Sequence, residues 1–195
     1  MVSSMTNCCI GVIAEDNTDC DAVRKIVHRV LGTNISTKPW AAKGCSTLKR
    51  KVSAKLELMS KDGCNAFVII HDLDRNPQNN SLNNEAVLRK KLETITSGIQ
   101  AVNKHICIPI EELEAWFWSD PKVVQHIGQG KGKAHLNPHL IIQPKEKLIH
   151  LSIGENRKPR YSTNMNVELA DILDLDLCSD RCPSFRCLRD FLQSL

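Results

Sequence analysis

The chain has 195 residues, the length of one domain, and its 42% hydrophobic residues are enough to form a core, which excludes intrinsic disorder for most of it. Its 26 basic and 22 acidic residues give a formal net charge of +4, which suits a polyanionic partner but lies far below that of a histone-like protein. The sequence contains no run of about 18 apolar residues, so we expect no membrane span. The first residues lack a basic region, so we expect no signal peptide.

The cysteines bear on the compartment. There are nine, an odd number, and most lie inside apolar or helical runs. Without a secretory signal, the simplest interpretation is reduced thiols in a cytoplasmic protein. Cys178, Cys182 and Cys187 lack the paired spacing of structural zinc sites, so we expect small buried side chains there.

Apolar runs and helical periodicities alternate along the first two thirds of the chain. Short runs rich in β-branched residues predict buried strands at residues 8–15, 34–40, 66–72 and 105–110. Amphipathic spacings predict helices at residues 18–32, 46–61, 85–103 and 111–118. We expect a capping box at Thr18 to Asp21 to begin the first helix and Pro39 to stop the second strand.

The last third is less regular. Residues 128–133, GQGKGK, predict a flexible basic loop, and residues 153–161 form a second polar, basic stretch. Residues 166–173 and 183–195 predict closing helices, the last with Pro183 in its first turn.

Alternating strands and helices predict an α/β sandwich, a mostly parallel central sheet flanked by helices. We expect a single domain over residues 1–195, with a core at about 7–127 and a helical or irregular C-terminal part at about 128–195. Within it, Leu113, Trp116 and Phe117 share a helical face and should enter the core.

Carboxylates follow three of the predicted strands. Because ligands of open α/β sheets bind outside the carboxyl ends of the strands, we expect these side chains to converge. Such a cluster needs a cation to offset repulsion, and oxygen ligands suit Mg²⁺ or Mn²⁺, which act on phosphoryl groups. The residues are Glu15 and Asp19, then Asp72 and Asp74, then Glu111, Glu112 and Glu114.

Each group also has a purely structural interpretation. Thr18 or Asp19 can cap a helix, and Asp72 and Asp74 can open a polar turn. The glutamates after the fourth strand can lie in a first helical turn, where negative charge is favourable. The metal hypothesis depends on the three groups meeting in space.

This arrangement resembles the Toprim domain of topoisomerases, primases and overcoming-lysogenisation-defect (OLD) nucleases. GVIAEDNTDCDAV is similar to the first Toprim motif, with Glu15 at its glutamate and Asp19 at the second acidic position of the OLD-type branch. VIIHDLD resembles the aspartate motif. IPIEELEAWFWSD and CPSFRCLRDFL resemble blocks of an uncharacterised Toprim-like branch often encoded beside AAA-type ATPases. Asp16 departs from the usual glycine after the glutamate.

The resemblance implies a Toprim-like Rossmannoid fold and Mg²⁺- or Mn²⁺-dependent phosphodiester hydrolysis. Glu15 would be the general base or acid, or a further ligand of the ion. The resemblance also implies a cytoplasmic effector of bacterial anti-phage defence or a toxin-like system, working with an AAA-type ATPase on DNA or RNA, in a possible homo-oligomer. The implied metal ligands are Asp19, Asp72, Asp74, Glu112 and Glu114, the last two preferred to Glu111.

Nucleic-acid backbone contacts need basic groups. We expect them from the two basic stretches, at Lys131, Lys133, Arg157, Lys158 and Arg160. The only tyrosine, Tyr161, is expected to lie far from the acidic groups, which disfavours a topoisomerase. The alternative functions are a non-catalytic Toprim-like module that binds a partner ATPase or nucleic acid, and a small phosphotransferase or phosphatase.

Overall fold

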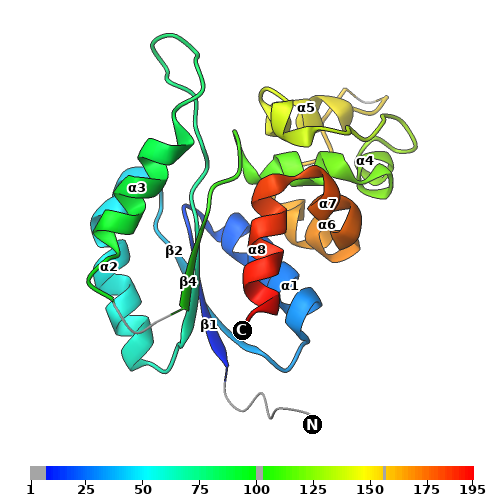
Figure 1. Cartoon of the computed structure of the whole chain (residues 1–195). Helices are drawn as coiled ribbons and strands as arrows, with labels where there is room; N and C mark the ends of the chain where they lie inside the picture. Colours follow the sequence, from blue (N-terminus) through cyan, green and yellow to red (C-terminus); the bar gives the residue numbers. More distant parts are fainter. Residues whose placement is uncertain (1–7, 100–102, 156) are drawn as a thin grey trace.

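The protein is built on a four-stranded, all-parallel sheet (Figure 1). This computed structural model describes residues 8–99, 103–155 and 157–195. The strands lie in the order β2-β1-β3-β4. They are β1 (Cys9–Ala14), β2 (Ser36–Ala41), β3 (Ala66–Ile70) and β4 (Asn103–Cys107). The predicted α/β architecture with a parallel central sheet is therefore confirmed.

Helices fill the connections between strands and the whole of the chain after β4. The strand connections contain α1 (Asn17–Leu31), α2 (Cys45–Lys61) and α3 (Glu85–Ile95). After β4 come the 3-10 segments η1 (Leu113–Ser119), η2 (Pro138–Leu140) and η3 (Thr163–Met165), and the helices α4 (Pro121–Ile127), α5 (Pro144–Leu151), α6 (Asn166–Ile172), α7 (Leu175–Arg181) and α8 (Pro183–Gln193).

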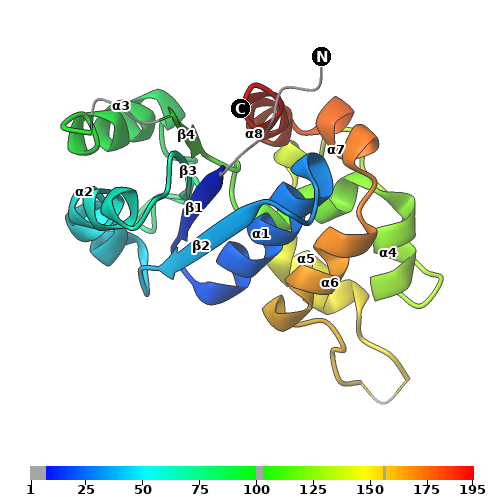
Figure 2. The same cartoon turned by 90° about the horizontal axis from the view of Figure 1, so that it is seen from below.

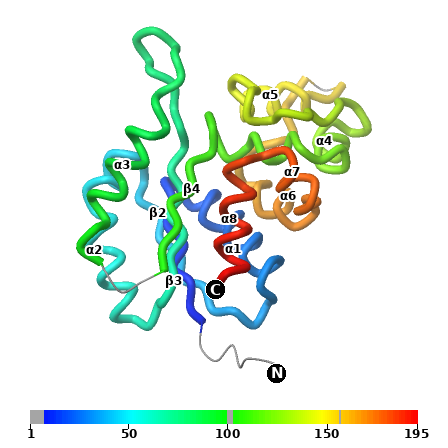
Figure 3. Tube along the Cα trace, in the orientation of Figure 1, coloured from blue at the N-terminus to red at the C-terminus, as the bar shows by residue number. Residues whose placement is uncertain are grey.

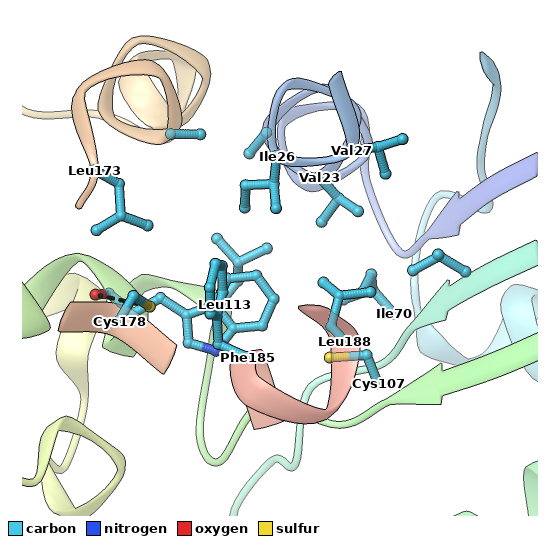
Figure 4. Close-up of a cluster of buried hydrophobic side chains, with 14 of the residues drawn as sticks. Val23, Ile26, Val27, Ile70, Cys107, Leu113, Leu173, Cys178, Phe185 and Leu188 are labelled. Atoms are coloured by element: carbon cyan, nitrogen blue, oxygen red, sulfur yellow. Dashed lines mark hydrogen bonds between the residues drawn. The ribbon is translucent and has the colours of Figure 1, made fainter. Parts of the chain in front are cut away.

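The helices cover both faces of the sheet (Figures 1 and 2). One face carries α1 and α8, with α6 packed on α1, and the other carries α2 and α3. Alternate strand residues enter two cores: Val12 and Val68 face α1, whereas Ile13 and Ile69 face α2. Figure 4 shows part of the first core, where side chains of the closing helix α8 meet those of α1 and the strands. Leu113, Trp116 and Phe117 enter this core as predicted.

The first helix begins at a different cap from the one predicted. The Asp16 carboxylate accepts a hydrogen bond from the Asp19 N–H at 3.0 Å, so Asp16, not Thr18, is the N-cap. The Thr18 hydroxyl instead donates to Asp16 Oδ1. Asp16 thus stabilises the helix start, and Asp19 is left buried in the first turn without capping it.

Several predicted element bounds were wrong. The fourth strand covers residues 103–107 rather than 105–110, and the helix predicted at 111–118 is the 3-10 segment η1, residues 113–119. Pro39 does not stop β2, because β2 is an edge strand and proline is tolerated there without losing a ladder hydrogen bond. Helix α3 ends at Ile95 rather than 103, where the Thr96 hydroxyl donates to the Leu92 carbonyl. Asn103 instead begins β4, because it pairs with Ala66 of β3. Residues 100–102 of the predicted helix, like residues 1–7, lie outside the described residues.

All nine cysteines are free thiols. Cys178 and Cys182 are buried in the first core as expected, but Cys187 is exposed, because it lies on the outer side of α8. No helix in the described part of the chain is both long and apolar enough to cross a membrane.

Gly11 permits close packing of β1 against β3. A Cβ atom at Gly11 would lie 2.4 Å from Cδ1 of the buried Phe67 ring. We therefore expect Gly11→Ala to lower the free energy of unfolding by about 1–3 kcal/mol, measured by urea denaturation. Gly98→Ala is the control, since no atom lies within 4 Å of its added Cβ. Equal stability of the two variants would contradict this packing argument.

Candidate metal centre at the carboxyl edge of the sheet

The strand order creates a switch point between β1 and β3. From β1 the chain crosses through α1 to β2 on one side, whereas β3 and β4 continue the sheet on the other. In open α/β sheets the crevice at such a point is the usual ligand site. Glu15 directly follows β1 and Asp72 lies two residues after β3, so both lie at this crevice.

Three carboxylates gather on the α1 side of this edge. Asp19 comes from the first turn of α1, Asp72 from the end of β3, and Glu114 from η1. Burial raises the pKa of Asp72, and the charges of Asp19 and Glu114 raise it further. Burial, Asp16 and Glu114 raise the pKa of Asp19 to about 8. Burial thus raises the pKa values of all three carboxyls, and the charge of Glu114 adds to the shift of the other two.

Glu15 faces the α2 side of the same edge. Its Oε1 lies 3.2 Å from Nδ1 of the buried His71, whose ring is also 2.8 Å from the Asp72 carbonyl. Burial, and then the charge of Asp74, raise the Glu15 pKa to about 7, against the opposing charge of Lys49. The charge of Glu15 also raises the pKa of Asp72, so Glu15 borders the carboxylates on the α1 side of the edge.

Two oxygens of these acidic groups are buried without a hydrogen-bond partner: Glu15 Oε1 and Asp72 Oδ1. Asp120 shows what a structural carboxylate looks like in this fold. It is completely buried, yet it accepts hydrogen bonds from the N–H groups of Lys122 and Asp174 at 2.8 and 2.7 Å. Buried oxygens that lack donors cost free energy unless a ligand, ion or water completes them, which makes these two oxygens the candidate ligand atoms of the site.

Glu114 is held by two residues that the sequence did not connect with the site. Asn166 Nδ2 donates to Glu114 Oε1 at 3.2 Å, and the Tyr161 hydroxyl donates to the same oxygen at 3.3 Å and to Asn166 Oδ1 at 2.7 Å. The expectation that Tyr161 lies far from the acidic groups was therefore wrong. Helices of the C-terminal part pack on η1 and bring Tyr161 to this edge. Because Tyr161 is buried, it orients Glu114 and is not an exposed nucleophile.

The other two glutamates after β4 are paired with basic side chains. Glu112 accepts a hydrogen bond from Lys145 Nζ at 2.6 Å and one from the Lys145 backbone N–H at 3.1 Å. Glu111, in a left-handed conformation with φ of 66°, forms an ion pair with Arg75 at 2.5 Å. Glu112 therefore borders the cluster as a neutralised group, and Glu111 anchors the loop after β3.

The remaining predicted residues lie in two places. Asp74 is exposed and stands close enough to Glu15 to raise its pKa. Of the predicted nucleic-acid contacts, Lys131 and Arg160 line one hollow of about 480 Å³ with Gly128 and Ile153. The structure does not place Lys133, Arg157 or Lys158 in that hollow.

The carboxylates provide the oxygen donors that a divalent cation requires. As the side chains lie, no three His, Cys, Asp or Glu groups among the described residues form a ready-made metal site. Binding would therefore require carboxylates to turn toward a common point. The oxygens of Glu15 and Asp72 that lack hydrogen-bond partners would be stabilised most by binding a cation. For this reason the residues fit a divalent ion.

The sequence matches the family described as a domain of unknown function, DUF4276, over residues 14–193. The chain belongs to this family. No curated protein and no solved structure matches it. The matched region of the DUF4276 domain contains all the acidic groups described above, together with Lys145, Tyr161 and Asn166.

The raised pKa values predict how stability depends on pH. In the folded DUF4276 domain Glu15 and Asp19 keep their protons to about pH 7 and 8, whereas the unfolded chain loses them near 4.5 and 3.8. Because the folded state binds more protons between these limits, its stability falls as pH rises. We expect the Tm without added metal to fall by several degrees from about pH 5 to about pH 8. A calorimetric Tm that rises over this range would contradict the cluster.

Two matched substitutions separate a binding carboxylate from a structural one. Asp72→Asn removes a carboxyl whose ionisation is opposed by burial and by the charges of its neighbours, so we expect a Tm at about pH 8 equal to or higher than that of the wild type. Asp120→Asn removes an acceptor from two backbone donors and should lower stability by about 1–3 kcal/mol. Thermal unfolding of both variants measures the difference, and a larger loss for Asp72→Asn would show that Asp72 has a structural role.

Proposed function

We propose that this protein is a divalent-metal-dependent nuclease that hydrolyses phosphodiester bonds of nucleic acids. The observation that carries the proposal is the convergence of Glu15, Asp19, Asp72 and Glu114 at the β1–β3 switch point, with buried oxygens of Glu15 and Asp72 left unpartnered. Clustered carboxylates of this kind are the common protein ligands of ions that act on phosphoryl groups.

Asp19, Asp72 and Glu114 would hold the ion. A bound divalent cation supplies charge neutralisation on the phosphoryl group and lowers the pKa of water. Asn166 and Tyr161 keep Glu114 directed into the cluster through their hydrogen bonds. Lys145 neutralises Glu112 and so limits the negative charge that the nucleic acid meets.

Glu15 is the residue best placed to move a proton. Its Oε1 is buried, lacks a hydrogen-bond partner, and lies at the border of the cluster rather than inside it. A carboxyl with a pKa of about 7 exchanges protons near neutral pH, as a general base or acid must. Oε1 would take the proton of the attacking water, and the buried His71 ring lies beside it, with Nδ1 at 3.2 Å.

The resemblance to Toprim domains supports the same chemistry, since the residues matched to the Toprim acidic motifs, Glu15, Asp19, Asp72 and Asp74, lie at this edge. The further parts of that hypothesis are a role in anti-phage defence or a toxin-like system, a partner AAA-type ATPase and self-association. They rest on the sequence resemblance alone and stay predictions.

The nuclease proposal is tested with purified protein and labelled DNA and RNA strands, with Mg²⁺, Mn²⁺ or EDTA. We expect cleavage only with a metal ion, and a loss of about 100-fold or more in rate for Glu15→Gln and for Asp72→Asn. Glu57→Gln, on the exposed side of α2, is the control and should keep full activity. Cleavage that persists in EDTA, or survives both site substitutions, would overturn the proposal.

A further inference from the structure

A pocket of about 390 Å³ opens beside the acidic cluster on the α2 and α3 side of the sheet. His71, Asp72 and Asp74 line one end of it, and the first turns of α3 line the other. Its volume lies in the range of small-molecule sites. The metal centre accounts for the acidic end only, so the rest of the pocket needs its own explanation.

Two ammonium groups from different helices line this pocket. Lys49 comes from α2 and Lys91 from α3. Neither forms an ion pair within the described residues, and the Lys49 charge reaches both Glu15 and His71. A pocket with carboxylates at one end and unpaired ammonium groups along its sides suits a ligand whose phosphates continue past a metal-bound one.

Apolar side chains complete the wall. Val87 is 66% exposed although it is a large hydrophobic residue, and with the half-buried Leu88 it gives the pocket an apolar surface. Val87 and Lys91 lie one helical turn apart, so they share a face of α3. This places an apolar surface next to a cation, as contact with a nucleobase and its phosphate requires.

The side of the pocket formed by α3 is held in place relative to the carboxylates at the edge of the sheet. Asn83 Nδ2 donates to the Asp74 carbonyl at 2.7 Å, and Asn84 Oδ1 accepts from the Val87 N–H at 3.1 Å as the cap of α3. The loop that carries these residues projects beyond the carboxyl ends of the strands (Figure 3), tied down by the ion pair of Arg75 with Glu111. A ligand in the pocket is therefore held at a fixed place relative to the carboxylates.

We infer that this pocket binds one unpaired nucleotide next to the scissile phosphate, so that the substrate is a single-stranded polynucleotide. The inference rests on the proposed nuclease function and adds the substrate class to it. Lys49 and Lys91 bind the flanking phosphates, and the base lies against Val87 and Leu88. A base in a duplex is stacked and paired, and it cannot reach this wall without leaving the helix.

Binding is measured by fluorescence anisotropy with the full chain and with Ca²⁺ in place of Mg²⁺, which separates binding from cleavage. The probes are labelled single strands of about 15 nucleotides, one of DNA and one of RNA, and a blunt DNA duplex of the same length. We expect at least one single strand to bind about tenfold or more tightly than the duplex. Equal or tighter binding of the duplex would overturn the inference.

The pocket itself is tested by substitution. Lys91→Glu and Val87→Asp should each weaken single-strand binding about tenfold, and an aspartate at the third position of α3 is compatible with the helix. Lys90→Glu is the matched control, because it makes the same charge change on an exposed neighbour that does not line the pocket. Equal effects of Lys91→Glu and Lys90→Glu would reduce the pocket to general electrostatic attraction and overturn the inference.

The two proposals fail in different ways. If the wild type cleaves with Mg²⁺ but the pocket variants bind as well as Lys90→Glu, the nuclease proposal stands and the single-strand pocket is wrong. If no strand is cleaved with any ion, yet Lys91→Glu alone abolishes single-strand binding, the pocket stands and the catalytic proposal is wrong.

Discussion

The parallel pairing of β1 with β3 is the constraint on which the candidate site depends. It brings residues 10–13 beside residues 66–69, so the side chains that follow the two strands must share one edge. Burial at that edge, together with mutual repulsion, raises the pKa values of Glu15, Asp19 and Asp72. The fold thus holds together carboxylates that would separate in solution, and a cation is the simplest partner that relieves their repulsion.

The C-terminal third completes the site as well as the core. Its helices cover α1 and the β4 side of the sheet, and they bring Tyr161 and Asn166 against Glu114. Lys145, at the start of α5, reaches Glu112 from the same region. A fragment that ended near residue 127 would therefore keep the strands but lose the groups that orient the η1 glutamates.

The acidic edge and the neighbouring pocket share Asp72 and Asp74, and the pocket also carries the ammonium groups of Lys49 and Lys91. In the proposed function the carboxylates would bind the cation, and Lys49 and Lys91, which line the neighbouring pocket, would bind further phosphates. The hydrogen bond from Asn83 to the Asp74 carbonyl fixes the pocket relative to the acidic edge. If the protein is the nuclease proposed above, such an arrangement would hold a strand in position before reaction, which lowers the entropic part of the barrier.

The sequence by itself determined the two central strands, since the short apolar runs that contain β1 and β3 (Ala66–Ile70) suit a sheet buried on both faces, whereas the ends of β2 and β4 depended on their pairing. It also indicated the acidic edge, because residues after parallel strands must emerge on the same side. It did not indicate Asp16 as the cap of α1, the early end of α3, or the place of Tyr161 and Lys145. Those depend on which segments distant in the chain meet, and only tertiary packing decides that, since contacts between residues 114 and 166 or 112 and 145 leave no local pattern.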